Sequence, residues 1–351
     1  MLVLCKRLYK LNHKVTILDI AKALKVTPGT VSRALSNHPR ISVETKQAVE
    51  KMAGKLNYRP NRIASSLRSG KSHVIGVIIP SAEINFFGSV VHGIESIANL
   101  HGYHVLIYQS NESYEHEVKG IETFLTARVD GVLASIAKDT RDYAHFLEVK
   151  ARGIPIVLFD RTNDDLGIPS VVTDDFKGAY TATEHLVRQG FQRVAHISGP
   201  QHMKIFKDRQ LGYMAALEEN KIRVNKALIF GGDVSIDSGR AAADYFFKQK
   251  KIPDAVFAVE DFTALGVIKA LKERNIRIPT DFGVVGFANE MFGLHITPSL
   301  STIDQQTVLM GREAIKLLLE ICNRNDESIE IKEKVVLEPL PFFRESSLRN
   351  K

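Results

Sequence analysis

The sequence predicts a small helical domain followed by a larger α/β region with parallel sheets. In the first 72 residues, apolar side chains recur at helical spacing behind good helix caps. After Ser72, short apolar runs rich in β-branched residues alternate with amphipathic stretches. The length of 351 residues is more than one hydrophobic core usually organises, so two or three domains are expected.

The composition is that of a globular protein, with 44% hydrophobic and 25% charged residues. No run of about 18 apolar residues is present, so we expect no contact with a membrane. Residues 1–14 form a basic extension that we expect to be disordered, and its apolar part is too short for a secretory signal. Cys5 and Cys322 form no CxxC pair. A cytoplasmic location is therefore the simplest expectation.

The net charge of +7 is distributed unevenly along the chain. Residues 1–72 contain 15 Lys and Arg against three acidic residues, a net charge of +12, whereas the remainder holds 32 Lys and Arg against 37 acidic residues. A segregated basic domain is the usual electrostatic footprint of nucleic-acid binding. The alternative is a solvated basic tail, but the apolar periodicity of this segment favours a folded domain.

Three helices are predicted in residues 15–60. Thr16 caps the first, with Asp19 in its first turn; Thr27 caps the second, with Pro28 at its first position; and Ser42 caps the third. The apolar residues expected to face the shared core are Ile17, Ile20, Ala21, Leu24, Val31, Ala34, Leu35, Val43, Ala48, Val49, Met52, Ala53 and Leu56. Two short helices joined by a tight turn and closed by a third are typical of a helix-turn-helix.

The second helix of such a motif enters the major groove of DNA. Its outward positions are expected to be Pro28, Gly29, Thr30, Ser32, Arg33 and Asn37. Arg33 can reach a guanine edge, and Thr30 and Ser32 suit phosphates. The alternative for Arg33 is a solvated surface arginine.

A linker is predicted in residues 61–72. Pro60 ends the third helix, and Asn61 can cap a short basic helix over residues 62–68, which Gly70 ends. A helix of this length is unstable alone in water, so we expect it to form only when something supports it.

The run from Thr16 to Asn37, then Tyr58-Arg-Pro-Asn61 and Ala64-Ser-Ser-Leu67, resembles the headpiece of the LacI/GalR repressor family. The resemblance implies a transcriptional regulator, a repressor, that binds a palindromic double-stranded DNA operator as a homodimer or tetramer. It also implies that Leu67 inserts between base pairs in the minor groove; the alternative is that Leu67 packs under the next domain. The residues assigned to DNA on this basis are Thr16, Thr27, Pro28, Gly29, Thr30, Ser32, Arg33, Asn37, Tyr58, Asn61, Ala64, Leu67 and Arg68. Pro28 and Gly29 depart from the polar residues of well-known members, so the operator sequence cannot be copied from them.

Strands are predicted at residues 73–79, 104–108, 131–134, 155–159, 193–197, 255–259 and 282–287. Helices are predicted at residues 87–102, 114–127, 177–190, 210–220, 238–250 and 263–274. Continuous apolar strands alternating with helices indicate parallel sheets covered on both faces. The sequence contains no GxGxxG and no P-loop, which argues against a nucleotide-using enzyme.

This region also resembles the family's effector domain, which is similar to periplasmic sugar-binding proteins. The resemblance implies a two-lobed domain over residues 73–345 that carries the effector site and the dimer contacts. The first lobe would comprise about 73–171 and 301–325, and the second about 172–300 and 326–345, including a C-terminal strand near 333–340. Ligands of such folds lie between the lobes, at the carboxyl ends of strands.

Six residues are predicted to contact the effector, namely Phe86, Phe87, Asp160, Arg209, Asp261 and Asn289. Each has a structural alternative. Asp160 could pair with Arg161 or cap a turn, Arg209 could form a salt bridge with Asp261, and Asn289 could be a turn residue. One of the two phenylalanines could belong to the core, and we favour Phe86 as the one that faces the ligand. These side chains suit a sugar, a sugar phosphate or another sugar derivative, and a nucleobase is the alternative. Met203 stands where purine-sensing members keep an arginine, which argues modestly against a purine.

We expect no cofactor, no metal site and no catalytic residues, because no nucleophile with a base and no metal-ligand spacing is found. The competing hypotheses are a ligand-binding protein without DNA function, which leaves the basic segment unexplained, and an α/β enzyme. The sequence leaves open whether the effector releases DNA or promotes its binding.

Overall fold

The computed structural model describes residues 15–58, 70–323 and 333–349 of the chain. Two compact units are present, residues 1–72 and residues 73–351. The interpretations of residues 1–14 and of the linker at 61–69 lie outside the described residues, as do Asn61, Ala64, Leu67 and Arg68.

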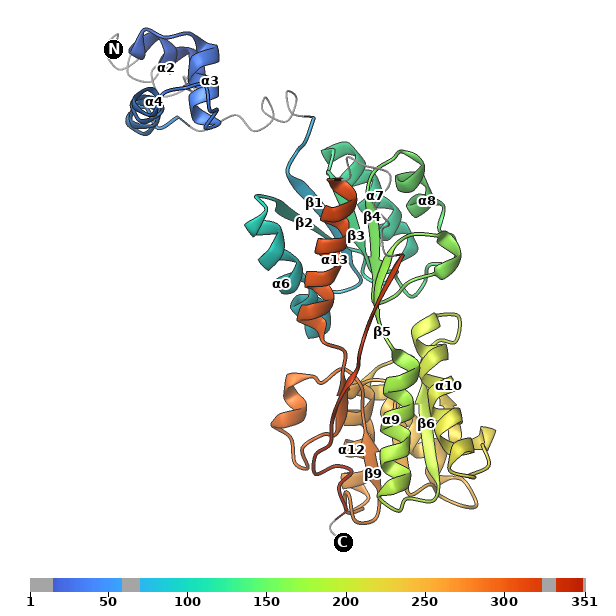
Figure 1. Ribbon diagram of the computed structural model, residues 1–351. Helices are drawn as coiled ribbons and strands as arrows, with labels where there is room; N and C mark the ends of the chain where they lie inside the picture. The colour runs from blue at the N-terminus through green and yellow to red at the C-terminus, as the bar shows by residue number, and fades with distance from the viewer. Residues whose placement is uncertain (1–14, 59–69, 324–332, 350–351) are drawn as a thin grey trace, which may run out of the picture. The chain divides into compact units, whose positions relative to one another are not determined.

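The first unit contains three helices, α2 (Ile17–Leu24), α3 (Pro28–Leu35) and α4 (Val43–Lys55) (Figure 1). Each begins directly after its predicted cap. The carboxylate of Asp19 accepts hydrogen bonds of 2.8 Å from the backbone N–H and the hydroxyl of Thr16. Thr27 Oγ1 accepts from Thr30 N at 3.1 Å, and Ser42 Oγ accepts from Thr45 N at 3.3 Å. The predicted helix-turn-helix is therefore confirmed.

The core of this unit lies where the three helices meet. Its buried apolar side chains are Ile20, Ala21, Val31, Ala34, Val49 and Ala53. The expectation for Val43 and Ala48 was wrong, because both are exposed. Val49 and Ala53 lie one helical turn apart and define the inward face of α4, and Val43 and Ala48 fall beside that face.

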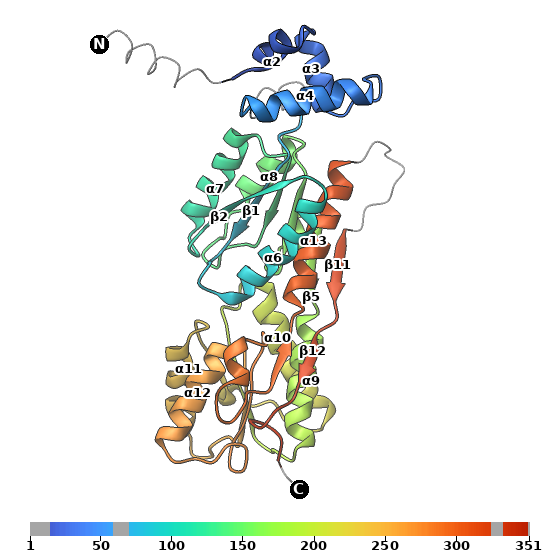
Figure 2. The same cartoon turned by 90° about the vertical axis from the view of Figure 1, so that its left-hand side faces the viewer.

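The second unit has two lobes, each built on a parallel sheet (Figures 1 and 2). In the first lobe the strand order is β11-β5-β4-β3-β1-β2. The strands are β1 (Val74–Ile79), β2 (His104–Gln109), β3 (Gly131–Ala134), β4 (Ile156–Phe159), β5 (Ser170–Thr173) and β11 (Lys334–Leu337). One face packs on α6 (Asn85–Leu100) and α13 (Thr307–Cys322), the other on α7 (Tyr114–Ala127) and α8 (Ala144–Ala151).

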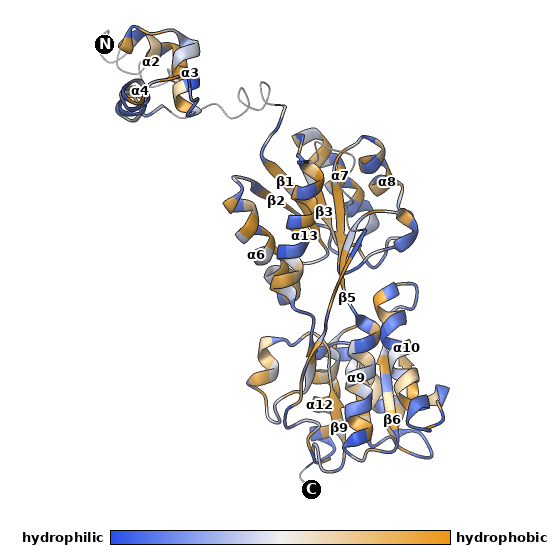
Figure 3. Cartoon of the chain, viewed as in Figure 1, coloured by the Kyte–Doolittle hydropathy of each residue, from blue (hydrophilic) through white to orange (hydrophobic). Residues whose placement is uncertain are grey.

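The second lobe has the strand order β7-β6-β8-β9. Its strands are β6 (Val194–Ser198), β7 (Ile229–Gly231), β8 (Ala255–Ala258) and β9 (Gly283–Val285). One face packs on α9 (Asp175–Arg188) and α10 (Lys204–Glu219), the other on α11 (Ile236–Phe247) and α12 (Asp261–Glu273). Strands β1 and β3 of the first lobe are hydrophobic along their length, as burial on both faces requires (Figure 3), whereas β6 of the second lobe contains His196 and Ser198.

The chain passes between the lobes three times, from β5 to α9, from β10 (Thr302–Asp304) to α13, and from β11 to β12 (Leu340–Phe342). Strands β10 and β12 pair antiparallel beside the second lobe. The expectation that a strand near 333–340 belongs to the second lobe was wrong for β11, which pairs in parallel with β5 in the first lobe. Short apolar runs suit either sheet, so the sequence alone did not identify this partner.

Helices α11 and α12 cross at a pair of glycines. A Cβ atom on Gly239 would lie 2.0 Å from Thr263 O, and one on Gly266 would lie 2.0 Å from Ile236 O. Only glycine permits this approach of the two backbones.

In the described part of the chain, none of the helices combines the length and the apolar character that crossing a membrane requires.

Candidate functional site

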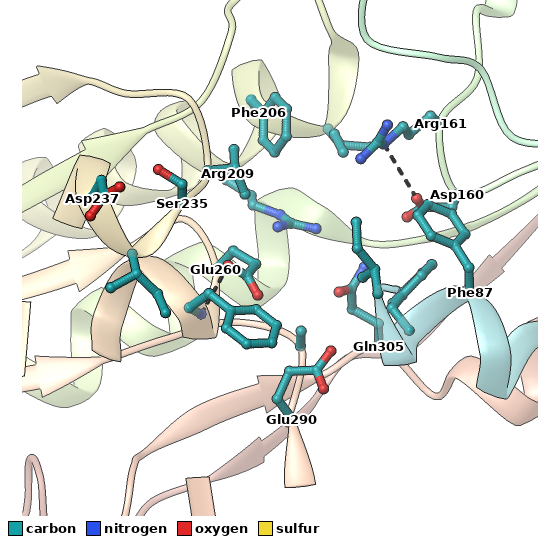
Figure 4. Close-up of a pocket in the computed structure, with 17 residues that line it drawn as sticks. Phe87, Asp160, Arg161, Phe206, Arg209, Ser235, Asp237, Glu260, Glu290 and Gln305 are labelled. Carbon is teal, nitrogen blue, oxygen red and sulfur yellow. Dashed lines mark hydrogen bonds and ion pairs between the residues drawn. The ribbon is translucent and has the colours of Figure 1, made fainter. Parts of the chain in front are cut away.

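A cavity of about 320 Å³ lies between the two lobes (Figure 4). Its polar lining consists of four acidic residues, two arginines, a serine and a glutamine, namely Asp160, Asp237, Glu260, Glu290, Arg161, Arg209, Ser235 and Gln305. Its aromatic lining is Phe86, Phe87, Phe206 and Phe262. Aliphatic side chains complete the wall, so the cavity combines apolar surfaces with a few polar groups, as small-molecule sites do.

The lining residues follow the carboxyl ends of the parallel strands. Asp160 comes directly after β4, and Glu260 comes two residues after β8. The segment that follows β9 brings Ala288 and Glu290 to the wall. Ligands of open α/β sheets bind at this edge, because the loops there diverge and leave a crevice. Two sheets facing each other across the cavity therefore present their binding edges to the same ligand.

Asp160 is buried at the cavity in a left-handed backbone conformation, with φ +58°. Its Oδ2 lies 3.8 Å from Arg161 Nε, while Arg161 Nη1 is bonded to both carboxylate oxygens of Glu112 at 2.7 and 2.9 Å. Burial raises the pKa of Asp160 to about 7, although Arg161 opposes the shift. Asp160 thus both contacts Arg161 and lies on the cavity wall.

Arg209 projects from α10 and is held by two buried groups. Its Nε and Nη2 lie 2.8 and 2.7 Å from Asp175 Oδ1, and Nη1 donates to Val259 O at 2.8 Å. Its guanidinium carbon lies 3.8 Å from the centre of the Phe287 ring. The partner of Arg209 is therefore Asp175, and the alternative of a bridge to Asp261 was wrong.

Phe86 and Phe87 both line the cavity, and both also belong to the core of the first lobe. Phe87 is the more buried of the two, and the Arg161 guanidinium lies 5.5 Å from its ring centre. Figure 4 shows Phe87 next to Asp160 and Arg161. The preference for Phe86 stays a prediction.

Asp261 and Asn289 do not lie on the cavity wall. Asp261 is fully buried; it accepts a hydrogen bond of 2.6 Å from Thr302 Oγ1 and one of 2.7 Å from Glu290 N. Asn289 donates to Asp304 Oδ2 at 2.9 Å and accepts from Arg344 Nη2 at 2.7 Å. The hydrogen bonds of both side chains hold the segment after β9 in place. Glu260, next to Asp261, and Ala288 and Glu290, on either side of Asn289, line the cavity.

The sequence analysis missed most of the wall, including six polar lining residues, namely Arg161, Ser235, Asp237, Glu260, Glu290 and Gln305. Burial and the neighbouring Asp261 raise the pKa of Glu260 to about 8. Burial also raises the pKa of Glu290, although hydrogen bonds from the Asn85 side chain and the Phe86 backbone of the other lobe lower it in part. Gln305 is only 3% exposed. Glu260 could have been found as the other carboxylate at the end of β8, whereas no local signal marks Gln305.

The helix-turn-helix presents its predicted residues on the surface of the first unit. Thr16, Thr27, Pro28, Gly29, Arg33 and Asn37 are exposed, and Thr30, Ser32 and Tyr58 are half-buried. Arg33 Nε donates to Gly29 O at 3.2 Å, and Lys46 Nζ donates to Asn37 Oδ1 at 2.7 Å. The first residues of α3 are thus accessible, as the reading helix of this motif requires.

Comparisons with known proteins match both units. Residues 16–61 match the model of bacterial regulatory proteins of the lacI family, and residues 72–345 match the model of periplasmic binding proteins and the sugar binding domain of the LacI family. Catabolite control protein A of Priestia megaterium is 31% identical over 318 residues, covering 90% of this chain and 95% of that protein. The ribose operon repressor of Halalkalibacterium halodurans is 33% identical over 305 residues, covering 87% and 89%.

Among solved structures, the lac repressor dimer bound to operator and the anti-inducer ONPF matches with a TM-score of 0.85. It shares 26% sequence identity and covers 96% of this chain and 100% of that one. The chain therefore belongs to the LacI family of bacterial regulatory proteins. It is a DNA-binding transcriptional repressor regulated by a small-molecule effector, with the helix-turn-helix and the two-lobed domain as its two functional parts.

Proposed function

We propose that the protein represses transcription from a palindromic operator as a homodimer, and that its effector is a carbohydrate bound in the interlobe cavity. The choice of effector rests on the composition of the cavity wall, which combines carboxyl groups, arginines and an amide with aromatic side chains. We also place the protein in the cytoplasm, where a regulator meets chromosomal DNA.

The DNA part of the proposal rests on charge and exposure. The segment 1–72 carries a net charge of +12, which favours phosphate contacts, and Arg33 is exposed near the start of α3. The similarity to a lac repressor dimer bound to operator supports the dimer and the DNA contact. A two-fold dimer requires a palindromic site because its two headpieces are related by the same symmetry.

The carbohydrate part rests on hydrogen-bond chemistry. Ligand hydroxyls donate to carboxylates such as Asp160 and Glu260, and an aromatic face can stack on a sugar ring. The cavity of about 320 Å³ lies at the lower end of the range for small-molecule sites, roughly 300–1,000 Å³, which suits a single ring. The name of the ribose operon repressor and the sugar-binding domain of the family model support this class.

A phosphorylated sugar fits this wall poorly. The two lining arginines already have carboxylate partners, Glu112 for Arg161 and Asp175 for Arg209. The wall groups that lack an ion-pair partner are carboxyl groups, which supply no positive charge to balance a phosphate. We therefore narrow the carbohydrate to one without phosphate.

The effector would act by binding both lobes at once. Asp160 and Phe87 belong to the first lobe, and Arg209 and Glu260 to the second. A ligand that contacts both favours one arrangement of the lobes and shifts the population toward it. We propose that this shift changes the affinity of the dimer for its operator, in a direction that the experiment below decides.

The experiment is calorimetry of the full chain against a panel of neutral and amino monosaccharides and against guanine, hypoxanthine and adenosine. Any sugar that binds is then added to a gel-shift assay on duplexes from the region upstream of the gene. We expect a sugar to bind and to change operator affinity, and Arg209→Ala to abolish the response while DNA binding persists. Binding of a nucleobase or nucleoside alone would overturn the proposed effector class.

A further inference from the structure

The interlobe cavity has more carboxyl groups than guanidinium groups on its wall. Arg161 and Arg209 form ion pairs with Glu112 and Asp175, although Arg161 Nε has no hydrogen-bond partner among the described residues. In contrast, Asp237, Glu260 and Glu290 have no ion-pair partner among the described residues. Three of the four carboxyl groups on the wall therefore lack an ion-pair partner, and a cationic group on a ligand would supply one.

Glu260 and Glu290 each use part of their hydrogen-bonding capacity at a helix N-terminus. Glu260 Oε2 accepts from Phe262 N at 2.9 Å and Thr263 N at 3.4 Å, at the start of its own helix α12. Glu290 accepts from the Asn85 side chain and the Phe86 backbone, at the start of α6. A carboxylate offers about four acceptor positions, so both groups keep capacity for a donor in the cavity.

A second observation indicates that a polar ligand completes the site. Gln305 is 97% buried and lines the cavity, and its side-chain amide has no hydrogen-bond partner among the described residues. Figure 4 shows this side chain on the cavity wall together with Asp160, Glu260 and Glu290. The amide of Gln305 is open to the cavity, so its oxygen and nitrogen can bond to the hydroxyl groups of a ligand.

We propose that the effector is an amino sugar whose protonated amino group is held by Glu260 and Glu290, while its hydroxyl groups bond to Asp160 and Gln305. This inference rests on the proposed carbohydrate effector and names its class. An ammonium group supplies three N–H donors, enough to serve both carboxylates. Phe262, which also lines the cavity, offers an aromatic face for a cation–π contact.

A proton accompanies this binding event. Because burial raises the pKa of Glu260 to about 8, its carboxyl group holds a proton at neutral pH in the absence of ligand. The titratable groups near it are Asp261 on α12, Glu290 after β9, and Asp160, Asp237, Arg161 and Arg209 on the rest of the wall. An ammonium group beside Glu260 favours the charged carboxylate, so a cationic ligand displaces the proton into the buffer.

The test is isothermal titration calorimetry of the full chain near pH 7 with three matched pairs: glucosamine and glucose, galactosamine and galactose, mannosamine and mannose. We expect the amino member of at least one pair to bind about tenfold or more tightly than its neutral partner, which corresponds to one charge-assisted contact. Repeating the titration in buffers of different ionisation enthalpy should reveal proton release for the amino sugar.

Other results overturn the inference in distinguishable ways. If neutral members bind as tightly as their amino partners, or if no proton is released, the amino group is not recognised, while a carbohydrate effector stands. If no member of any pair binds, the amino-sugar assignment fails, and the wider panel of sugars and nucleobases decides the carbohydrate proposal separately.

Glu260→Gln tests the site itself, since glutamine keeps the size and can still accept at the N-terminus of α12. We expect the amino-to-neutral preference to fall to about threefold or less, and Glu290→Gln should act in the same direction. The matched control is Glu273→Gln on the exposed part of α12, where Glu273 pairs with Arg240, and it should keep the full preference. A full preference in both cavity variants, each with an unchanged melting curve, would contradict the assignment. Should Glu260→Gln not fold, Glu290→Gln with its own melting curve decides.

Discussion

Arg209 directs two nitrogens at one oxygen of Asp175, with Nε 2.8 Å and Nη2 2.7 Å from Oδ1. Asp175 is the first residue of α9, two positions after β5 ends at Thr173, where the chain crosses between the lobes. The arginine on the cavity wall is thus bonded to a crossing segment. A ligand bound to Arg209 would therefore touch a side chain that is bonded to the crossing segment.

Loss of this ion pair should destabilise the two-lobed unit. Asp175→Ala leaves the buried Arg209 charge without its partner, which costs about 3–5 kcal/mol in comparable cases. Urea denaturation followed by circular dichroism measures the free energy of unfolding. The control is Arg240→Ala, which breaks an exposed pair with Glu273 and should cost about 1 kcal/mol or less. Equal losses in the two variants would show that burial of the Arg209 pair has no energetic weight.

Substitution of Arg33 should weaken operator binding. A bidentate contact from arginine to guanine contributes about 1–3 kcal/mol of discrimination, so Arg33→Ala should lose roughly tenfold to a hundredfold in operator affinity. Fluorescence anisotropy on the selected operator and on a scrambled duplex measures both affinity and specificity. Arg277→Ala, an exposed arginine of the second lobe paired with Asp281, should bind like the parent. An unchanged affinity in Arg33→Ala would place this side chain away from the bases.

The stability of the ligand-free protein should fall as the pH rises from about 6.5 to about 8; at lower pH the buried His185 and His196, whose pKa values are lowered to about 4, act in the opposite direction. The pKa values of Asp160 and Asp261 are raised from 3.8 to about 7, and that of Glu260 from 4.5 to about 8, in each case chiefly by burial. The folded state therefore binds more protons than the unfolded state across this window, which makes unfolding easier as protons are removed. Thermal melts at intervals of half a pH unit measure the slope, and Glu260→Gln should flatten it near pH 7. A melting temperature that rises over this window would contradict the raised pKa values.

Addition of one methyl group between α11 and α12 should be costly. Gly266→Ala places a Cβ 2.0 Å from Ile236 O, so the two helices must move apart. Overpacking of this kind costs about 1–3 kcal/mol, measurable by denaturation. Gly54→Ala in α4 is the control, because a Cβ there meets nothing within 4 Å and alanine favours a helix. A neutral result for Gly266→Ala would mean that the helix crossing adjusts freely.

Local chemistry made the helical unit predictable from sequence. Thr27 and Ser42 accept from backbone N–H groups three residues on, and Asp19 accepts from the backbone N–H of Thr16, so these effects are visible in the sequence itself. The same holds for the strands β1, β3 and β4, whose unbroken apolar runs require burial on both faces. The partner of β11 depends on a segment more than 160 residues away, and no local property distinguishes the two sheets.

The candidate site also contains some residues that the sequence marks locally and others that only the folded chain brings together. Asp160 and Arg209 were found because a strand end and a family motif mark them, and both line the cavity. Asp261 was chosen over Glu260 at the same strand end, but its carboxyl group turns inward to Thr302 and the backbone of Glu290, both distant in sequence. Gln305 enters the wall from the crossing between β10 and α13, which only the assembled lobes bring to the cavity.

The most direct test of the account is titration of a labelled operator duplex with the full chain across a series of salt concentrations, with and without the bound sugar. We predict tight binding whose logarithm falls steeply with the logarithm of salt concentration, because basic residues of the first unit displace counterions from phosphates. We also predict that the sugar changes this affinity and that Arg209→Ala does not respond to it. Failure to bind any duplex at low ionic strength would contradict the assignment of this protein as a DNA-binding regulator.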